Sequence, residues 1–370
     1  MVFIENICTI QAPIRLNIDP SYASLKLWVI VSHGALRRGN EVYMEHNIII
    51  LERNSVGTDI DTDCLQDFGK VTAYSNTVTP EEAGARIADV HADIVIANKV
   101  PINARTLEKA GGSVKLIAEF ATGYDNVDIN YCNEHHIAVA NLGSYATDSV
   151  AQHTFTLALC ILEHIHFYDT YVKSGDYARQ DRFSNFDAPF TELAGKTWGI
   201  AGMGNIGRRV AEIAAAFGCH VVFYPTSGRS SCTEFEQVDL DTLLRESDIL
   251  SIHCPLTDRT RHLIDAGALA KMKHTAIIIN VARGAVVDNT ALYDALINNR
   301  IGGAGLDVLE NEPIRPDDVL SQYHDSNRLI ITPHMAWAST EARKRCVSIT
   351  YDNIKNFLNG TPTHIVNSYV

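Results

Sequence analysis

Residues 196–207 read Lys-Thr-Trp-Gly-Ile-Ala-Gly-Met-Gly-Asn-Ile-Gly, an apolar run that passes directly into three spaced glycines. The apolar run predicts a short buried strand, and residues 208–217 after the glycines are typical of a helix. The first glycine permits a tight turn, the second lets the backbone approach a ligand, and the third allows close packing of the helix on the strand. Because the free N–H groups at the start of such a helix favour an anion, the stretch predicts a site for the pyrophosphate of a dinucleotide.

Short apolar segments alternate with helical segments along most of the chain. Upstream, the predicted strands are 48–51, 71–74, 94–97, 116–120 and 137–140, with helices at 80–90 and 103–110. A helix over 148–173 and a polar loop over 175–189 follow. The second series has predicted strands at 197–201, 220–224, 249–253, 276–280, 305–308 and 329–332, helices at 206–217, 240–246 and 290–298, and a last helix over 339–358. This alternation predicts an α/β protein with two doubly wound parallel sheets in series.

The composition is that of a globular protein with room for two domains: 370 residues, 46% of them hydrophobic and 20% charged. The formal net charge of −13 argues against a general nucleic-acid or anionic-membrane surface, because both need a basic face. No apolar run reaches the roughly 18 residues of a membrane span. The eight cysteines form no C-x-x-C pair and no cluster with metal-ligand spacing. We therefore expect free thiols, no metal site and a reducing, cytoplasmic location.

The first 43 residues show no sustained hydrophobic period, whereas a regular pattern begins at Met44. One hypothesis is that translation starts at Met44 and that residues 1–43 are not native to the protein. The alternative is a genuine, poorly ordered extension. N-terminal sequencing of the natively expressed protein separates the two.

The strand predicted at 220–224 lacks the acidic residue that commonly follows it in NAD-binding sites, where it accepts hydrogen bonds from the ribose. The chain instead continues Pro225-Thr226-Ser227-Gly228-Arg229. Hydroxyls and an arginine suit the 2′-phosphate of NADP. They are equally compatible with NAD, if Thr226 and Ser227 bind the ribose and Arg229 stacks on adenine or lies in solvent. The sequence leaves the choice between NAD and NADP open.

Three polar residues follow the ends of predicted strands in the second series: Arg283, Glu312 and His334. In a parallel sheet these strands end at one edge, where ligands bind, so their loops are expected to converge beside the cofactor. A guanidinium can bind the carboxylate of a 2-oxo acid and polarise its carbonyl. A histidine can donate a proton to the alkoxide that forms on hydride transfer, and a carboxylate can orient that histidine. We therefore predict Arg283 as substrate anchor, His334 as acid/base and Glu312 as its partner.

The motif set resembles the D-isomer-specific 2-hydroxyacid dehydrogenase family from about residue 44 to the C-terminus. The matching segments are 202–207, 253–257, 280–284, 306–313 and 332–334, together with the substrate-side loop 121–128. The resemblance implies a flavodoxin-like substrate domain of residues 44–142 and 337–370. It also implies a Rossmann coenzyme domain of residues 143–336 inserted between them, a cleft between the two, and usually a homodimer.

The resemblance adds further contacts, such as Asn205, Cys254 and Asp307, to those already predicted from the glycine-rich stretch and from residues 225–229. The cofactor positions are Gly202, Gly204, Asn205, Ile206, Gly207, Thr226, Ser227, Arg229, Cys254, Pro255, Thr260, Val281, Ala282 and Asp307, the last as partner of the nicotinamide amide. The substrate carboxylate is expected to meet Arg283 and also the backbone near Lys99, Val100 and Asn126.

Within the family, residues 333–343 are most similar to glycerate dehydrogenases and hydroxypyruvate reductases. The sequence thus predicts an NAD(P)-dependent enzyme that reduces a small 2-oxo acid, hydroxypyruvate or glyoxylate, with no nucleic-acid or membrane partner. A dinucleotide-sensing protein that acts as a corepressor is the alternative, because relatives of that kind can keep the same three polar residues.

Overall fold

The computed structural model describes residues 29–31, 35–38, 41–44 and 46–369, and the side chains of 46–369. Strands β1 (Val29–Val31), β2 (Ala35–Arg38) and β3 (Glu41–Met44) form a separate antiparallel sheet. The hypothesis about residues 1–43 lies largely outside the described residues. The sequence predicted no strands there, so β1–β3 are an addition to the prediction.

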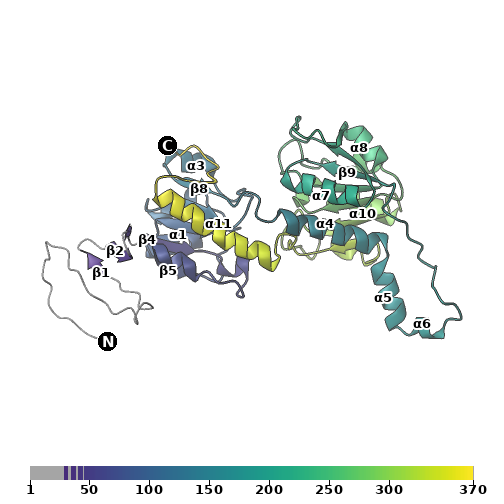
Figure 1. Ribbon diagram of the computed structural model, residues 1–370, viewed down its shortest axis with the longest axis horizontal. Coiled ribbons are helices and arrows are strands. Elements are labelled where there is room, and N and C mark those ends of the chain that lie inside the picture. The colour runs from purple at the N-terminus through teal and green to yellow at the C-terminus, as the bar shows by residue number, and fades with distance from the viewer. Residues whose placement is uncertain (1–28, 32–34, 39–40, 45, 370) are drawn as a thin grey trace, which may run out of the picture.

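The first large sheet has five parallel strands. They are β4 (His46–Ile50), β5 (Gly69–Ala73), β6 (Ile94–Ala97), β7 (Leu116–Glu119) and β8 (Ala138–Ala140). Their spatial order is β5-β4-β6-β7-β8, the order of flavodoxin-like folds. Helices α1 (Pro80–Asp89) and α2 (Ala104–Ala110) pack on each other, and the last helix, α11 (Thr340–Leu358), returns to pack against β7. Figure 1 shows α11 (yellow) lying on the first unit, which is this sheet with its helices and otherwise comes from the early part of the chain.

The second sheet has seven parallel strands. They are β9 (Thr197–Ala201), β10 (His220–Tyr224), β11 (Glu236–Gln237), β12 (Ile249–Ile252), β13 (Ile277–Asn280), β14 (Gly303–Leu306) and β15 (Leu329–Ile331). Their order is β11-β10-β9-β12-β13-β14-β15, which contains the dinucleotide-binding order 3-2-1-4-5-6. Helices α4 (Thr147–Leu162) and α7 (Asn205–Ala216) pack together against this sheet. The predicted α/β class with two doubly wound sheets is confirmed.

One apolar core joins the two sheets. It contains β4 residues such as Ile48 and β9 residues such as Trp198, and Tyr145, Val150 and Ala336 belong to the same cluster of buried side chains. Phe155 of α4 stacks on Trp198, with ring centroids 4.5 Å apart. Since α4 begins where the chain leaves the first sheet, this helix ties the two units together.

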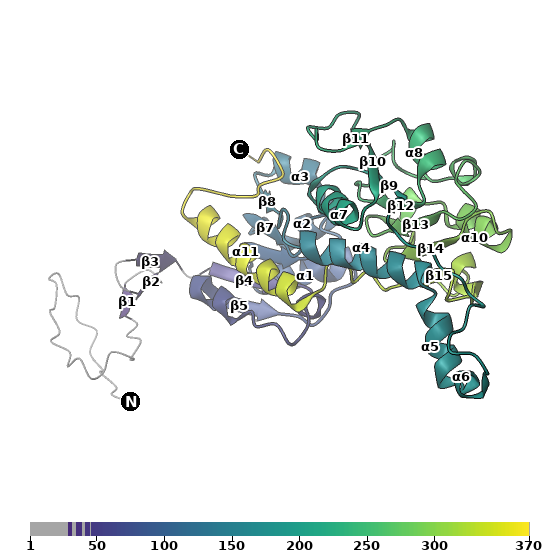
Figure 2. The ribbon, with the colours of Figure 1, turned by 45° about the vertical axis from the view of Figure 1, so that its right-hand side comes forward.

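The predicted helix over 148–173 is in fact two helices, α4 and α5 (Ile165–Lys173). The backbone at His164 is left-handed, with φ of 49°, and this interrupts the helical hydrogen-bond ladder. The loop predicted over 175–189 contains a short helix, α6 (Asp176–Arg179). Helices α5 and α6 project as an arm from the second unit (Figure 2). Three further α-helices or strands were not predicted: α3 (Ile129–Glu134), α9 (Ala266–Leu269) and the two-residue strand β11.

Elsewhere the predicted strands agree with the structure to within about two residues. Strand β14 spans 303–306 rather than 305–308, because Ala304 pairs with Ile278 and Gly305 with Ile279. In the part of the chain that the structure describes, no helix is long and apolar enough to cross a membrane.

A buried acid ends β7. Glu119 is fully buried, and the amide nitrogen of Asn126 lies 3.3 Å and 3.4 Å from its two carboxylate oxygens. Burial, reinforced by the nearby Glu52 carboxylate, raises the pKa of Glu119 from 4.5 to about 8, although Asn126 and Lys99 oppose the shift.

The raised pKa of Glu119 predicts a pH-dependent loss of stability. The unfolded chain ionises this group near pH 4.5 and the folded chain near pH 8, so this contribution to the free energy of unfolding falls across that interval. Glu119→Gln keeps an oxygen acceptor and removes the titration. The stability of the variant relative to wild type should therefore rise from pH 5 to pH 8, measured by chemical unfolding at both values. The exposed Glu246→Gln is the control, and an equal difference at the two pH values would contradict the prediction.

Candidate active site

A cleft of about 900 Å³ lies between the loops at the carboxyl ends of the two sheets. Its walls come from the loop 121–128, the first turn of α4 and the segments that follow β12, β13, β14 and β15. The predicted site residues that line it are Lys99, Asn126, Ile206, Cys254, Pro255, Val281, Ala282, Arg283, Asp307 and His334. The structure thus brings residues from both sheets to one cavity. Among residues 46–369, no group of three or more His, Cys, Asp or Glu side chains could hold a metal ion.

The glycine-rich turn links β9 to α7. Gly202 has φ of 99°, and a Cβ at Gly207 would lie 2.2 Å from the Gly202 carbonyl oxygen, so a side chain is excluded there. A Cβ at Gly204, in contrast, would meet no atom of the described residues within 4 Å, so this side of the turn is open. The amide of Asn205 donates to the hydroxyl of Ser144 in the segment that enters α4. The turn therefore offers free space and the N-terminus of α7 to an anionic group.

The loop after β10 contains the hydroxyls and the arginine noted in the sequence. The Ser227 hydroxyl donates to the Arg229 carbonyl over 2.8 Å, within this loop. A second arginine, Arg259, lies 3.8 Å from the position that a Cβ would take at Gly228. Sequence reasoning missed Arg259, because it comes from the loop after β12 and only the folded sheet places it here.

Cys254 and Thr260, two predicted cofactor positions that follow β12, differ in their surroundings. Burial raises the pKa of the Cys254 thiol to about 11, although a hydrogen bond with Thr226 opposes the shift. The Thr260 hydroxyl donates to the Pro255 carbonyl over 2.7 Å and accepts from the Thr257 amide over 2.8 Å, and Thr260 is 2% exposed. Thr260 therefore shapes the loop from within.

His334 and Glu312 form a hydrogen-bonded pair. His334 Nδ1 lies 2.5 Å from Glu312 Oε2, and Glu312 Oε1 accepts from the Leu309 amide over 3.0 Å. Burial alone would raise the pKa of Glu312, but the hydrogen bond and charge of His334, the Leu309 amide and Lys99 together lower it. The ionised carboxylate thus fixes the ring through Nδ1, so Nε2 is the nitrogen available to the cleft.

Arg283 reaches across the cleft to the loop of the first sheet. Its Nε donates to Asp125 Oδ2 over 3.1 Å, and an Nη donates to the Ala282 carbonyl over 2.9 Å. A Cβ at Gly123 would lie 2.0 Å from the other Nη, so the guanidinium rests directly on the backbone of Gly123. Sequence reasoning assigned loop 121–128 to the substrate side but missed Gly123 and Asp125 as contacts of Arg283.

The backbone at Lys99 and Val100 differs from the expectation. The amides of Asn98, Lys99 and Val100 all donate to the carboxylate of Glu52, over 2.8–3.1 Å. They are therefore not free to bind a substrate carboxylate. Glu52, which follows β4, was missed because its alignment with the end of β6 depends on strand order.

The side chains of this loop remain close to the cleft. Part of the Lys99 side chain is exposed to the cleft. Burial of the ammonium group and the positive charge of Arg283 lower the pKa of Lys99. The nearby acidic groups Glu312, Asp125 and Glu119 oppose this shift. The Asn126 amide donates to the Val100 carbonyl over 3.1 Å and so links the two substrate-side loops.

Asp307 is 1% exposed and accepts several hydrogen bonds. Its carboxylate accepts from the Thr332 hydroxyl over 2.6 Å and from the amides of Met335 and Ala336 over 2.9 and 2.8 Å. Its carbonyl accepts from the His334 amide over 2.8 Å. Asp307 therefore holds the loop that carries His334, in addition to lining the cleft where a nicotinamide partner was predicted.

Comparison with known proteins identifies the family. The model of the "D-isomer specific 2-hydroxyacid dehydrogenase, NAD binding domain" matches residues 155–336. A hydroxypyruvate reductase of Blautia hydrogenotrophica is 37% identical over 84% of this chain and 95% of its own. A glycerate dehydrogenase of Methylorubrum extorquens is 37% identical over 87% and 99%.

A solved structure shows the same similarity. It is the NADPH-dependent glyoxylate/hydroxypyruvate reductase of Sinorhizobium meliloti in complex with NADP and malonate. It has a TM-score of 0.73 and 27% identity, covering 88% of this chain and 98% of that chain. The chain therefore belongs to the D-isomer-specific 2-hydroxyacid dehydrogenase family, as its motifs predicted, and is an NAD(P)-dependent oxidoreductase.

Proposed function

We propose that this chain reduces a small 2-oxo acid, hydroxypyruvate or glyoxylate, to the corresponding 2-hydroxy acid of D configuration where the product is chiral. The observation that carries the proposal is that His334, hydrogen-bonded to Glu312, lines the same cleft as Arg283. The names of the relatives, hydroxypyruvate reductase and glycerate dehydrogenase, support the substrate class.

The residues of the cleft fit a dinucleotide. The open side of Gly204, the N-terminus of α7 and the crevice between β9 and β12, where the strand order reverses, suit a pyrophosphate. Residues Gly202–Gly207 would hold it there, with Ile206, Cys254, Val281 and Ala282 along the cleft wall. When bound, the nicotinamide supplies the hydride that adds to the carbonyl carbon of the substrate.

The protein groups supply binding and the proton. Arg283 already binds the carboxylate of Asp125. The carboxylate of the substrate offers the same kind of acceptor, so Arg283 would exchange Asp125 for the substrate carboxylate and carbonyl. His334 donates a proton from Nε2 to the oxygen on which negative charge develops. Glu312 holds the ring and stabilises its charged form through Nδ1.

We further propose that NADPH is used at least as well as NADH. Thr226, Ser227 and Arg229 follow β10 in place of an acid, and Arg259 lies beside the same loop. Two cationic side chains near the ribose end favour a 2′-phosphate. NAD use remains compatible with the family model, which describes an NAD-binding domain.

The domain division proposed from the sequence has support from the sheets. We assign residues 44–142 and 337–370 to a substrate-binding domain and 143–336 to the coenzyme domain. The five strands of one sheet and the seven of the other fall on either side of this division, and α11 packs on β7. A cytoplasmic location is part of the same proposal.

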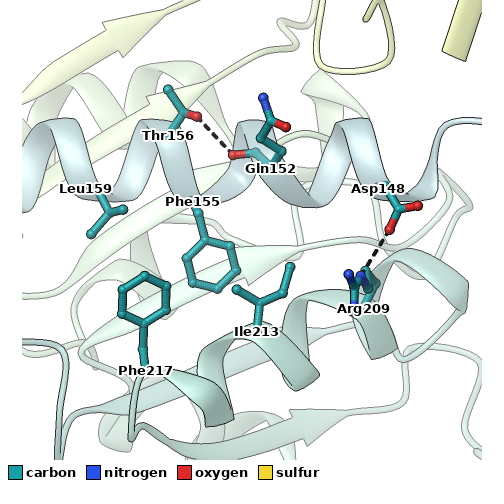
Figure 3. Close-up of a pocket in the computed structure, with 8 residues that line it drawn as sticks. All are labelled: Asp148, Gln152, Phe155, Thr156, Leu159, Arg209, Ile213 and Phe217. Atoms are coloured by element: carbon teal, nitrogen blue, oxygen red, sulfur yellow. Dashed lines mark hydrogen bonds and ion pairs between the residues drawn. The ribbon is translucent and has the colours of Figure 1, made fainter. Parts of the chain in front are cut away.

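A homodimer is proposed from the arm of the second unit. The arm and the loop after it expose large apolar side chains: Ile165, Val172, Phe183, Phe186 and Phe190. Phe183 is 93% exposed, and large exposed apolar surfaces often mark sites of protein–protein contact. A groove between α4 and α7, floored by Phe155, Ile213 and Phe217, lies on the same unit (Figure 3). An arm of one copy and a groove of another suit a symmetric interface.

The test of the proposed function is cofactor oxidation with a panel of 2-oxo acids, run with NADH and with NADPH. Turnover of hydroxypyruvate or glyoxylate supports it. Binding of either cofactor without turnover of any 2-oxo acid would overturn it and favour the corepressor-like alternative.

His334→Ala removes the proposed proton donor. We expect turnover to fall by roughly 100-fold or more, because general acid catalysis is lost, while cofactor affinity stays the same. Steady-state kinetics and NAD(P)H fluorescence titration measure the two effects. Wild-type turnover in the variant would refute the role of His334.

Gly123→Ala tests the position of Arg283. The added methyl would lie 2.0 Å from an Nη atom, so the flexible guanidinium must move while the backbone stays in place. We expect kcat/KM to fall by about 10- to 100-fold, as is usual when a binding group is displaced by about 1 Å. Gly267→Ala on α9 (Ala266–Leu269), where the nearest atom would be a side-chain oxygen at 3.3 Å, is the control. An unchanged kcat/KM for Gly123→Ala would contradict this geometry.

Phe183→Ser combined with Phe186→Ser tests the arm. Light scattering after size-exclusion chromatography should give twice the chain mass for wild type and the mass of one chain for the variant. The control is Val78→Ser, which changes an exposed apolar residue of the first unit. A dimeric variant would place the interface elsewhere.

A further inference from the structure

We propose that His153 of α4 is a positioning residue for catalysis: through Thr332 and Asp307 it holds the loop 332–336 in the conformation that presents His334 to the cleft. The inference rests on the proposed role of His334 as proton donor. His153 is not among the residues that line the cleft. It must therefore act through the loop.

A conformational constraint explains why this loop needs support. His334 has φ of 53°, in the left-handed region that is unfavourable for residues with a side chain. With this turn, the consecutive amides of His334, Met335 and Ala336 all donate to Asp307. Three hydrogen bonds to one residue thus stabilise a backbone that is otherwise unfavourable.

The donors and acceptors present determine which group donates in each of these hydrogen bonds. Thr332 has a single hydroxyl proton, and it donates this proton to Asp307 Oδ1 over 2.6 Å. His153 Nε2 lies 2.9 Å from the same hydroxyl oxygen, which can then only accept. His153 must therefore carry its proton on Nε2. The same nitrogen lies 3.5 Å from Asp307 Oδ1, so the imidazole bounds the carboxylate on the side facing α4.

A second contact from α4 reaches the other end of the loop. The Ser149 hydroxyl donates to the Ala336 carbonyl over 2.7 Å. Ser149 and His153 are four residues apart, so they lie on the same face of the helix. One face of α4 thus contacts both Thr332 and Ala336, the two ends of the segment that carries His334. Because α4 also packs on β13 and β14, its contacts hold the loop at a defined position relative to the sheet.

Two substitutions of His153 separate positioning from mere packing. His153→Leu removes the donor with similar bulk, and His153→Gln retains an N–H donor at a comparable distance from the backbone. We expect His153→Leu to lower kcat about 10-fold, as for loss of one hydrogen bond to a charged network, with a smaller change in the KM of the 2-oxo acid. His153→Gln should recover most of the loss. Thr332→Val should reproduce His153→Leu, and the double variant should be no worse than either single one.

A readout independent of turnover is the hydrogen exchange of the Met335 and Ala336 amides. We expect exchange to be about 10-fold faster in His153→Leu and near wild type in His153→Gln. His274→Leu is the matched control, because this exposed histidine precedes β13 and lies at the amino ends of the strands, away from the cleft. If wild type shows no turnover, the proposed function fails while the exchange data still decide the role of His153.

Two outcomes would overturn the positioning role. The first is wild-type kcat and wild-type exchange in His153→Leu. The second is a His153→Gln variant as impaired as His153→Leu, because a packing role gives no rescue by a hydrogen-bond donor. If His153→Leu does not fold, Thr332→Val carries the same expectations and the same contradiction.

Discussion

The carboxyl edges of two parallel sheets open onto one cleft, and the rest of the site depends on this constraint. Parallel strands end on the same side, so the residues that follow β9, β12, β13, β14 and β15 are neighbours in space although the sequence separates them widely. The first sheet contributes the loops after β6 and β7 in the same way. A cofactor loop, a guanidinium and an imidazole can therefore share a cavity without any local sequence signal that joins them.

Within this frame, buried carboxylates position the loops. Glu52 accepts the amides of residues 98–100, and Asp307 accepts those of 335 and 336. Both carboxylates are less than 10% exposed, and an unpaired charge at such depth would be strongly unfavourable. Each loop is thus held by a group that cannot leave it without losing its own hydrogen bonds. These hydrogen bonds stabilise the conformation of the backbone on both sides of the cleft.

The sequence predicted the two sheets because buried parallel strands appear as continuous apolar runs bounded by turn residues. It also predicted the Glu312–His334 contact, since both follow strands of one sheet. It did not predict the helix break at His164, which has no glycine or proline to mark it. Gly123, Glu52 and Arg259 were missed because their importance depends on which strand lies beside which, and strand order leaves no trace in hydrophobic period.

The distribution of used and unused donors determines what the cleft can bind. The amides of Lys99 and Val100 donate to Glu52, so they are not available to a substrate carboxylate. Asp125 is 72% exposed and contacts Arg283 through one nitrogen, which is a weak, solvent-screened pair that an incoming carboxylate can replace. His334 lines the cleft and has Nδ1 bound to Glu312, which leaves Nε2 for a ligand. An anion with an adjacent carbonyl is therefore the ligand that satisfies the remaining donors together, and a neutral ligand would leave Arg283 with Asp125.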